Sequence, residues 1–464
     1  MSVERVLPKT LDYTDVLPLA VESKSRRRTF FPTNGATFQS NGANIIRIDL
    51  SADALLDTQH SYLVFTFTQG AGQTAGFDYA GGHAFIKRLR IEQSGTVLED
   101  IQNYNVLMGA IVLPCQSTAE HKKTRTLTEG IRGDGARAGG LQAAIAATAA
   151  DAASTRRNTG ISNNPDDLIA QNGAYRFAIP LTSGLMNCDK LVPLMLMSAP
   201  LTIEIELENA TTALCQTGGG VAYTISDVRY VANLVEVGQD VSQQLRMLQE
   251  VSGGVLTLAG QTYRHFSGQY GAGATNNVVN VPARVKSMKS LFFTFRGVDG
   301  ANGPGASSAL YDLGQGTTAH ISSYQLKIGS VVYPPTPVRA QVTGAASINV
   351  NNASEMLMEL EKAWGNTGSR FGLSSESHVA TFYTDGTGRA GTNNNYKFAP
   401  FGLDLEAFQK VAIESGVNTA DRSLPISLIT EHSGAAAHAQ NIDVYVLADA
   451  LFYINQDGSM SVSV

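Results

Sequence analysis

The chain has few cysteines and lacks long apolar runs. Three cysteines in 464 residues argue against a disulfide scaffold, since disulfide-stapled modules are short and cysteine-dense. No stretch approaches the roughly 18 to 20 apolar residues of a membrane-spanning helix. Acidic and basic residues are scattered through the first twenty positions, where a secretory signal needs an apolar run, so we expect no secretion signal.

Charge is also scarce. Charged residues make up 16% of the chain, against a usual share of about 25%. The 34 basic and 40 acidic residues give a net charge of 34 − 40 = −6, which argues against a surface that coats nucleic acid. Glycine is abundant at 45 residues, above the usual share of about 7%. Such a composition favours many turns and a surface partly buried against partners.

The clearest pattern is the period-two alternation of half-buried strands. In the run 201–207 four apolar residues alternate with Thr202, Glu204 and Glu206. Helical spacing is rare, and predicts helices over 99–112, 241–251 and 354–364, with an alanine-rich helix at 141–153. Many short strands with few helices predict an all-β protein of sandwiches or barrels.

The chain repeats itself at a long period, which indicates an internal duplication. Four pairs of segments recur in the same order with offsets of 228, 235, 221 and 217 residues. The pairs are 63–67 with 291–295, 94–97 with 329–332, 175–178 with 396–399, and 232–237 with 449–454. Each repeat of about 210 residues suits one eight-stranded jelly roll with long loops.

These boundaries divide the chain into four parts. Residues 1–28 form an N-terminal arm, and residues 29–238 form a first jelly roll with a helical insertion at about 116–172. Residues 239–253 form a linker helix, and residues 254–464 form a second jelly roll and a C-terminal tail. We expect the arm and the tail from residue 456 onward to become ordered only against neighbouring subunits.

Three blocks of sequence carry a resemblance to a known family. Residues 86–99 read as a strand, a tight turn and a helix entry, residues 177–207 hold two proline-leucine strands, and residues 324–334 read as a matching hairpin. Together they resemble the double jelly-roll major capsid proteins of tailless icosahedral double-stranded DNA viruses. That lineage includes the adenovirus hexon and the capsid proteins of virophages and polinton-like viruses.

The resemblance implies two consecutive eight-stranded jelly rolls and a homotrimer whose six upright barrels form a pseudo-hexagonal block. It also implies that trimers tile an icosahedral shell around a DNA genome, with neighbouring trimers, penton proteins and minor capsid proteins as partners. The expected location is the virion, and long loops such as 116–172 would form an outer tower or clamps between subunits. No catalysis and no cofactor are expected.

Other motifs have simpler explanations. The spacing of Gly386, Gly388 and Gly391 matches a dinucleotide fingerprint, but no helix follows to hold a pyrophosphate. The eight histidines form no zinc spacing, so they are interpreted as structural or exposed, and no metal site is assigned. Glu204 and Glu206 could line a glycosidase cleft, but alternation on an amphipathic strand explains them more simply.

One charge run stands out near the N-terminus, formed by Lys24, Arg26, Arg27 and Arg28. It predicts contact with phosphate, on an internal membrane or the genome, or a nuclear-targeting patch, or else a solvated terminus. Two rival functions also stay open: a β-sandwich protein that binds or cleaves carbohydrate, and a trimeric viral spike. The single tryptophan, Trp364, lies on a predicted helix stripe, which favours a core role over a sugar platform.

Overall fold

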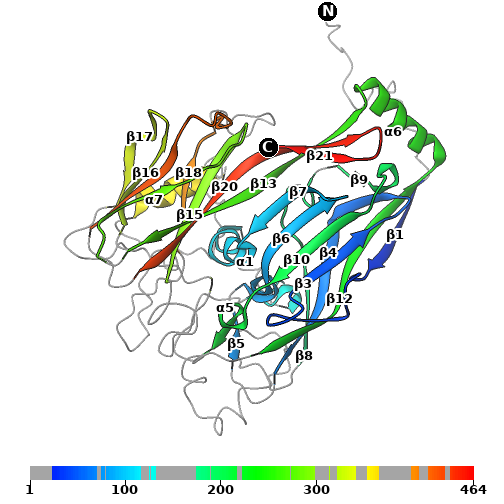
Figure 1. The fold of residues 1–464 in the computed structure, drawn as a ribbon, viewed down its shortest axis with the longest axis horizontal. Coiled ribbons are helices and arrows are strands. Elements are labelled where there is room, and N and C mark those ends of the chain that lie inside the picture. The colour runs from blue at the N-terminus through cyan, green and yellow to red at the C-terminus, as the bar shows by residue number, and fades with distance from the viewer. Residues whose placement is uncertain are drawn as a thin grey trace, which may run out of the picture.

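The protein is built from two barrels that lie side by side along its longest axis (Figure 1). The computed structural model describes residues 23–70, 75–78, 80–116, 125, 127–131, 174–188, 190–216, 222–271, 273–297, 313, 321–340, 353–364, 399–406, 416–433 and 439–464. Several predictions lie outside these residues: the arm over 1–22, the helix at 141–153, most of the insertion, and the glycine motif at 386–391.

The first barrel has two main antiparallel sheets. One sheet has the order β1 (Ser23–Phe30), β12 (Tyr223–Val237), β4 (Leu55–Gln69) and β8 (Ala174–Ile179), with β2 (Thr37–Gln39) on β12 and β9 (Val192–Pro193) on β4. The other has the order β3 (Ile45–Leu50), β10 (Leu201–Leu207), β6 (Ile86–Gln93) and β7 (Thr96–Gln102). A separate short pair joins β11 (Leu214–Gln216) to β5 (Ala75–Phe77).

The second barrel repeats this arrangement. Its first sheet has the order β13 (Val255–Tyr270), β20 (Gln440–Asn455), β15 (Met288–Gly297) and β18 (Phe401–Asp404), with β21 (Met460–Ser463) on β20. Its second has the order β14 (Asn276–Asn280), β19 (Ile426–His432), β16 (Ile321–Ile328) and β17 (Val331–Arg339). When the eight main strands of each half are counted along the chain, both halves have sheets of order 1-8-3-6 and 2-7-4-5. This shared order defines a jelly roll in each half.

The repeated sequences occupy equivalent strands. Leu63 on β4 lies opposite Tyr230, and its counterpart Leu291 on β15 lies opposite Val446. Tyr230 and Val446 are therefore equivalent, which gives an offset between β12 and β20 of 446 − 230 = 216. This is one residue less than the offset of 217 in the sequence pairing of 232–237 with 449–454. A shift of one residue would exchange the core face of a strand for its outer face, so the sheet register corrects that pairing.

Each core is an aromatic layer between the two sheets. In the first barrel Phe67 lies 5.0 Å from Phe85, measured between ring centroids. In the second, Phe293 stacks on Phe401, also at 5.0 Å. Phe67 and Phe293 come from the period-two positions of β4 and β15, and both are fully buried. The alternation in the sequence therefore identified the core correctly.

Helical segments are short in the described residues. They are η2 (Gly81–Phe85), α1 (Tyr104–Val106), η3 (Leu107–Val112), α2 (Leu113–Gln116), η4 (Leu194–Leu196), α5 (Ala210–Ala213), α6 (Gln239–Val251) and α7 (Ser354–Ala363). The predicted helices at 241–251 and 354–364 are present as α6 and α7. None of the helices in the described ranges is long and apolar enough to cross a membrane.

The predicted helix at 99–112 is wrong in its first five residues. Residues 99–102 belong to β7, and helical structure begins only at Tyr104. A bulge explains the error: Ile91 lies opposite Glu99 but Glu92 lies opposite Val97, so Leu98 is an extra residue. The bulge separates the buried side chains of Leu98 and Ile101 by three positions, which imitates helical spacing.

Both chain ends contain strands that were predicted as terminal segments. Residues 23–28, assigned to the N-terminal arm, lie in β1 and pair with β12. Residues 460–463, assigned to the tail, form β21 and pair with β20 of the same chain. The expectation that residues 23–28 and 460–463 need a neighbouring subunit for order is therefore wrong, because backbone hydrogen bonds within the chain hold them.

Candidate functional site

The most elaborate contact of the chain is the junction between its barrels. The first barrel contributes β7 and the segment that follows it, residues 103–116, which we call the junction helix. Asn103 adopts left-handed backbone angles, with φ of 48°, and turns the chain from β7 into this helix. Every side chain from Tyr104 to Cys115 is buried. A helix that is apolar on all sides requires cover on all sides, and the second barrel supplies part of it.

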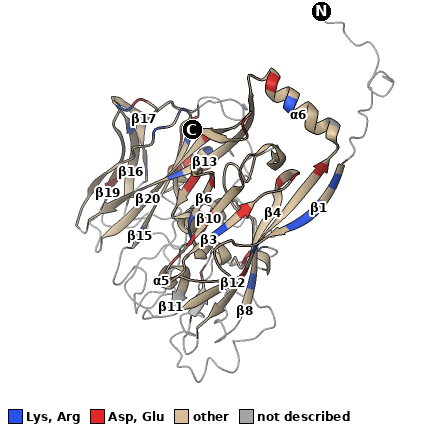
Figure 2. Cartoon of the chain, turned by 45° about the vertical axis from the view of Figure 1, so that its right-hand side comes forward, with Lys and Arg blue, Asp and Glu red and all other residues tan. Residues whose placement is uncertain are grey.

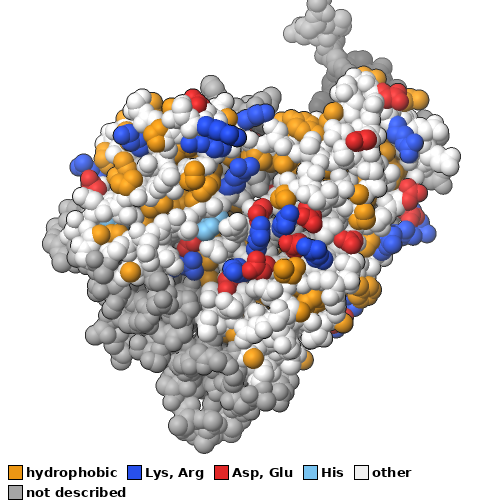
Figure 3. Space-filling model, viewed as in Figure 1, with side chains coloured by type: hydrophobic (Ala, Val, Ile, Leu, Met, Phe, Trp, Pro, Cys, Tyr) orange, Lys and Arg blue, Asp and Glu red, His pale blue; other side chains and the backbone are white. Residues whose placement is uncertain are grey.

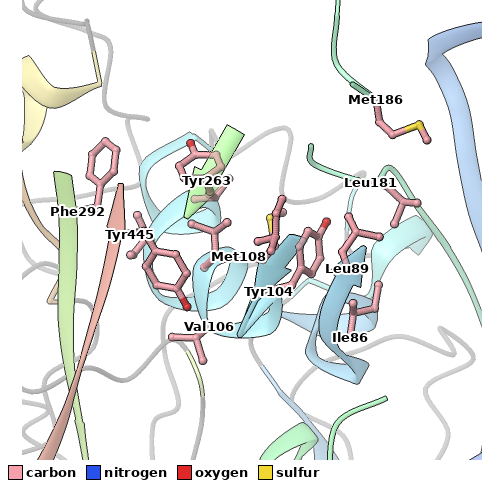
Figure 4. Packing of buried hydrophobic residues seen from close by; sticks show 14 of the residues in the cluster. Ile86, Leu89, Tyr104, Val106, Met108, Leu181, Met186, Tyr263, Phe292 and Tyr445 are labelled. Carbon is pink, nitrogen blue, oxygen red and sulfur yellow. The ribbon is translucent and has the colours of Figure 1, made fainter. Parts of the chain in front are cut away.

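The junction helix packs on the outer face of the second barrel. Figure 4 shows Val106 and Met108 on the side of Tyr263, Phe292 and Tyr445, which come from β13, β15 and β20. Tyr445 is fully buried although it points away from its own barrel's core, and its hydroxyl donates to the carbonyl of Asn103 at 2.8 Å. The strands of this sheet are therefore buried on both faces.

A charged cluster is buried at the same place. Asp443 on β20 lies 2.8 Å from His265 Nε2 and 2.5 Å from Arg296 Nε, and accepts a hydrogen bond from Asn103 Nδ2 at 3.3 Å. Burial alone would raise the pKa of Asp443, but the charge of Arg296 and the His265 hydrogen bond hold that pKa well below its usual range. Asn103 thus connects the first barrel to an ion pair of the second.

A close backbone contact also joins the barrels, at Gly184 of the first. Within that barrel, Glu99 on β7 is buried and holds this segment by accepting the backbone N–H groups of Gly184 and Leu185 at 2.8 and 2.9 Å. Burial raises the pKa of Glu99 in spite of these hydrogen bonds. Gly184 in turn meets β13 so closely that a Cβ on Gly260 would lie 2.4 Å from the Gly184 carbonyl oxygen.

The hairpin of β20 and β21 forms the other end of the junction. Gln93, at the end of β6, donates to the carbonyl of Gly458 at 3.0 Å and accepts the N–H of Met460 at 2.6 Å. Ser198 of the first barrel donates its N–H to the same carbonyl at 3.1 Å. The tail of the chain is therefore part of the barrel junction.

A polar groove of about 600 Å³ opens along this junction. Both barrels line it, with Ser183 and Asn187 from the first and Gln261, Lys289 and Asp449 from the second. Lys289 lies 3.0 Å from Glu406 and 3.4 Å from Asp449, so its charge is already balanced. Burial opposes the charged form of Lys289, but the two carboxylates outweigh it and raise its pKa.

The carboxylates considered for a glycosidase cleft are ion-paired. Glu204 lies 2.7 Å from Arg47 and 3.7 Å from Arg90, and Glu206 lies 2.9 Å from Lys87. They form part of a mixed field of charges over β3, β10 and β6 (Figure 3). This field has the alternation of an exposed sheet face, with each strand's charges opposite those of its neighbour.

The described histidines have structural partners. His83 contacts Glu129 at 2.9 Å, His265 contacts Asp443, and His432 contacts Thr430 at 2.9 Å. No group of three or more potential ligands within the described ranges could hold a metal ion.

The predicted basic run lies on β1, at the outer edge of the first barrel (Figure 2). Arg26 pairs with Glu236 at 2.7 Å, and the Arg28 guanidinium lies 4.8 Å from the centre of the Phe30 ring. Lys24 and Arg27 are exposed and make no such contact in the described part of the chain. Contact of these four residues with phosphate stays a prediction.

Sequence reasoning missed the junction residues. One signal could have revealed them, because a strand buried on both faces is a continuous apolar run instead of an alternating one. Residues 444–448 are such a run in β20, whereas the counterpart run 228–232 in β12 is interrupted by Arg229.

Comparisons with known proteins identify the fold. No family model and no curated sequence matches the chain. Among solved structures, the Faustovirus major capsid protein matches with a TM-score of 0.58 at 8% identity, covering 95% of this chain and 92% of that one. A chain of the PBCV-1 virus capsid matches at 0.56 and 9% identity, covering 97% and 99%. A chain of the Sputnik virophage matches at 0.54 and 10% identity, covering 100% and 93%. The chain therefore has the double jelly-roll fold of these capsid proteins over its whole described length.

Proposed function

We propose that the chain is the major capsid protein of a tailless icosahedral DNA virus. Its work is self-assembly: homotrimers with six barrels in a pseudo-hexagonal ring tile a shell that encloses the genome. The observation that carries the proposal is the buried junction, which holds two jelly rolls of identical strand order in one fixed arrangement. The likeness to capsid proteins over the full length supports it.

The remaining parts of the proposal follow from the same assignment. Neighbouring trimers, penton proteins and minor capsid proteins are the expected partners, and the virion is the expected location. No catalytic residue is assigned. Permanent interfaces between subunits of this kind bury on the order of 2,000–5,000 Å².

The test is the mass of the purified chain in solution, measured by light scattering behind a sizing column. One chain is 49.2 kDa, so a trimer is 3 × 49.2 = 147.6 kDa. The proposal expects that mass, or a much larger closed particle, with no dissociation at micromolar concentration. A stable monomer would refute it.

The rival of a carbohydrate protein receives less support from the structure. Glu204 and Glu206 are neutralised by cations on neighbouring strands. Trp364 is not a free platform, because its ring lies 4.7 Å from that of Phe292. A trimeric spike would have the same mass as the capsid trimer, but it would not form closed shells. Electron microscopy of assembled material distinguishes the capsid protein from the spike.

A further inference from the structure

Two exposed loops next to β2 and β3 contain the same dipeptide, asparagine followed by glycine. The chain has four such pairs, at Asn34, Asn41, Asn172 and Asn302, and the first two lie in the described residues. Asparagine is a thermolabile residue, and it is most labile before glycine, because glycine has no side chain to keep the asparagine carboxamide away from the next backbone nitrogen. Asn34 and Asn41 are both exposed, so solvent access does not distinguish them.

The carboxamide of Asn34 is held in place by the backbone of β3. Its Nδ2 donates to the carbonyl of Ile45 at 2.7 Å, and its Oδ1 accepts the N–H of Arg47 at 3.0 Å. β3 is an edge strand of its sheet, and these are the two groups that a further antiparallel strand would bond there. The carboxamide would have to break both hydrogen bonds before its carbon could reach the nitrogen of Gly35.

The carboxamide of Asn41 is not held in this way. Asn41 lies in the turn between β2 and β3, and its side chain makes no hydrogen bond or ion pair to any other residue that the structure describes. The N–H of Gly42 donates to the carbonyl of Gln39 at 3.3 Å, which is longer than the usual range for a backbone hydrogen bond. Nothing lies within 4 Å of a Cβ added to Gly42, so the space around this pair is open. The Asn41 side chain can therefore reach the nitrogen of Gly42.

We propose that Asn41 is a site of spontaneous deamidation and that Asn34 is protected from it. The Gly42 nitrogen gives up its proton to hydroxide and attacks Cγ of Asn41, so that a new C–N bond closes a succinimide ring. The bond from Cγ to Nδ2 breaks, and Nδ2 takes a proton from water and leaves as ammonia. Water then opens the ring at either of its carbonyl carbons, which yields aspartate or isoaspartate. The reaction consumes water and changes no oxidation state.

Either product changes the turn between β2 and β3. Both add a carboxylate to a chain that already has a net charge of −6, and isoaspartate also adds one methylene to the main chain. The turn connects directly to β2, where Phe38 is fully buried and lies opposite Ile225 of β12. Each copy of the chain therefore acquires with age a surface charge and an altered turn that is anchored in the core. This inference does not depend on the proposed function.

The test follows the two asparagines in the same molecule. The purified full-length protein is kept in mildly alkaline buffer, and samples are digested at mildly acidic pH and analysed by mass spectrometry, with fragmentation to assign each conversion to Asn34 or Asn41. Methylation of the digests by an isoaspartyl carboxyl methyltransferase identifies the isoaspartate product. A parallel incubation in urea removes the fold. Gly42→Ala and Gly35→Ala are matched variants that alter one pair each, and circular dichroism checks that both are folded.

In the folded protein, Asn41 should convert at least about tenfold faster than Asn34, because Asn34 must first give up two hydrogen bonds. In urea the two rates should agree within about threefold, since both residues then precede glycine in an unfolded chain. Gly42→Ala should slow the conversion of Asn41 by about tenfold and leave Asn34 unchanged. Gly35→Ala should slow the conversion of Asn34 in urea by the same factor.

Three results would overturn the inference. If Asn34 converts as fast as Asn41 in the folded protein, the hydrogen bonds to β3 give no protection. If Asn41 converts in urea but stays intact in the folded protein, the turn itself prevents ring closure. If Gly42→Ala leaves the rate at Asn41 unchanged, the carboxamide is not lost through a succinimide. None of these results affects the mass of the oligomer, so the proposed function is tested separately.

Discussion

The two helical segments that follow equivalent hairpins differ in what covers them. Residues 104–115 are buried on every side, because the second barrel packs on them. Helix α7 stands at the same place in the second barrel and leaves Met358 and Glu355 exposed. The same position of the fold is therefore covered in the first barrel and partly exposed in the second.

The equivalent sheets of the two barrels also differ in how far their outer faces are covered. β20 has buried side chains on both faces around Asp443 and Tyr445, because the junction helix covers its outer face. On β12, the equivalent strand of the first barrel, Arg229 stands at the position of Tyr445 and remains partly exposed. The outer face of the equivalent sheet is therefore covered in the second barrel and less covered in the first.

The largest effect is expected from Asp443→Asn, which removes the charge at the centre of the junction. The nearly buried Arg296 would then lose the charge of the carboxylate that lies 2.5 Å from its Nε. We expect a loss of about 3–5 kcal/mol in the free energy of unfolding, measured by denaturant titration at fixed protein concentration. Asp53→Asn, an exposed aspartate of the first barrel, is the control. Equal stability of the two variants would mean that the buried cluster does not hold the barrels together.

Next comes a matched pair that compares the two helical segments directly. Met108→Ala removes a side chain that is 1% exposed, and should cost about 2–5 kcal/mol of folding stability. Met358→Ala, at 51% exposure, should change the stability of a single chain by less than about 0.5 kcal/mol. Denaturant titration followed by circular dichroism measures both variants. Equal losses would mean that α7 is covered as fully as the junction helix.

A smaller effect is expected where the barrels approach most closely. Gly260→Ala adds a Cβ that would lie 2.4 Å from a backbone oxygen, which only a shift of the barrels can relieve. Overpacking of this kind costs about 1–3 kcal/mol. Gly42→Ala is the control, since nothing lies within 4 Å of its added Cβ. Thermal unfolding of the two variants would separate crowding at the junction from a general effect of losing glycine.

The smallest effect concerns pH. The pKa of Asp443 is lower in the folded chain than in the unfolded one, so its contribution to stability is complete above about pH 4 and is lost as the pH falls below that value. The slope from one such group is at most about 1.4 kcal/mol per pH unit. Stability of the wild type between pH 5 and pH 2 should therefore fall more steeply than that of Asp443→Asn. Parallel curves would show that Asp443 is not ionised in the junction.

Local patterns predicted most of the barrel strands, but they could not predict how the barrels meet. Alternation identified β4, β10 and β15, since a half-buried strand has one apolar face. The bulge at Leu98 disguised β7, and the basic run concealed β1, whose pairing comes entirely from β12. The cluster of Asn103, His265 and Asp443 joins residues up to 340 positions apart, so no spacing in the sequence reveals it.

The most direct test of the account is an electron cryo-microscopy map of the assembled oligomer. The account predicts a closed ring of six barrels in three chains. Single chains, or an oligomer without such a ring, would contradict it.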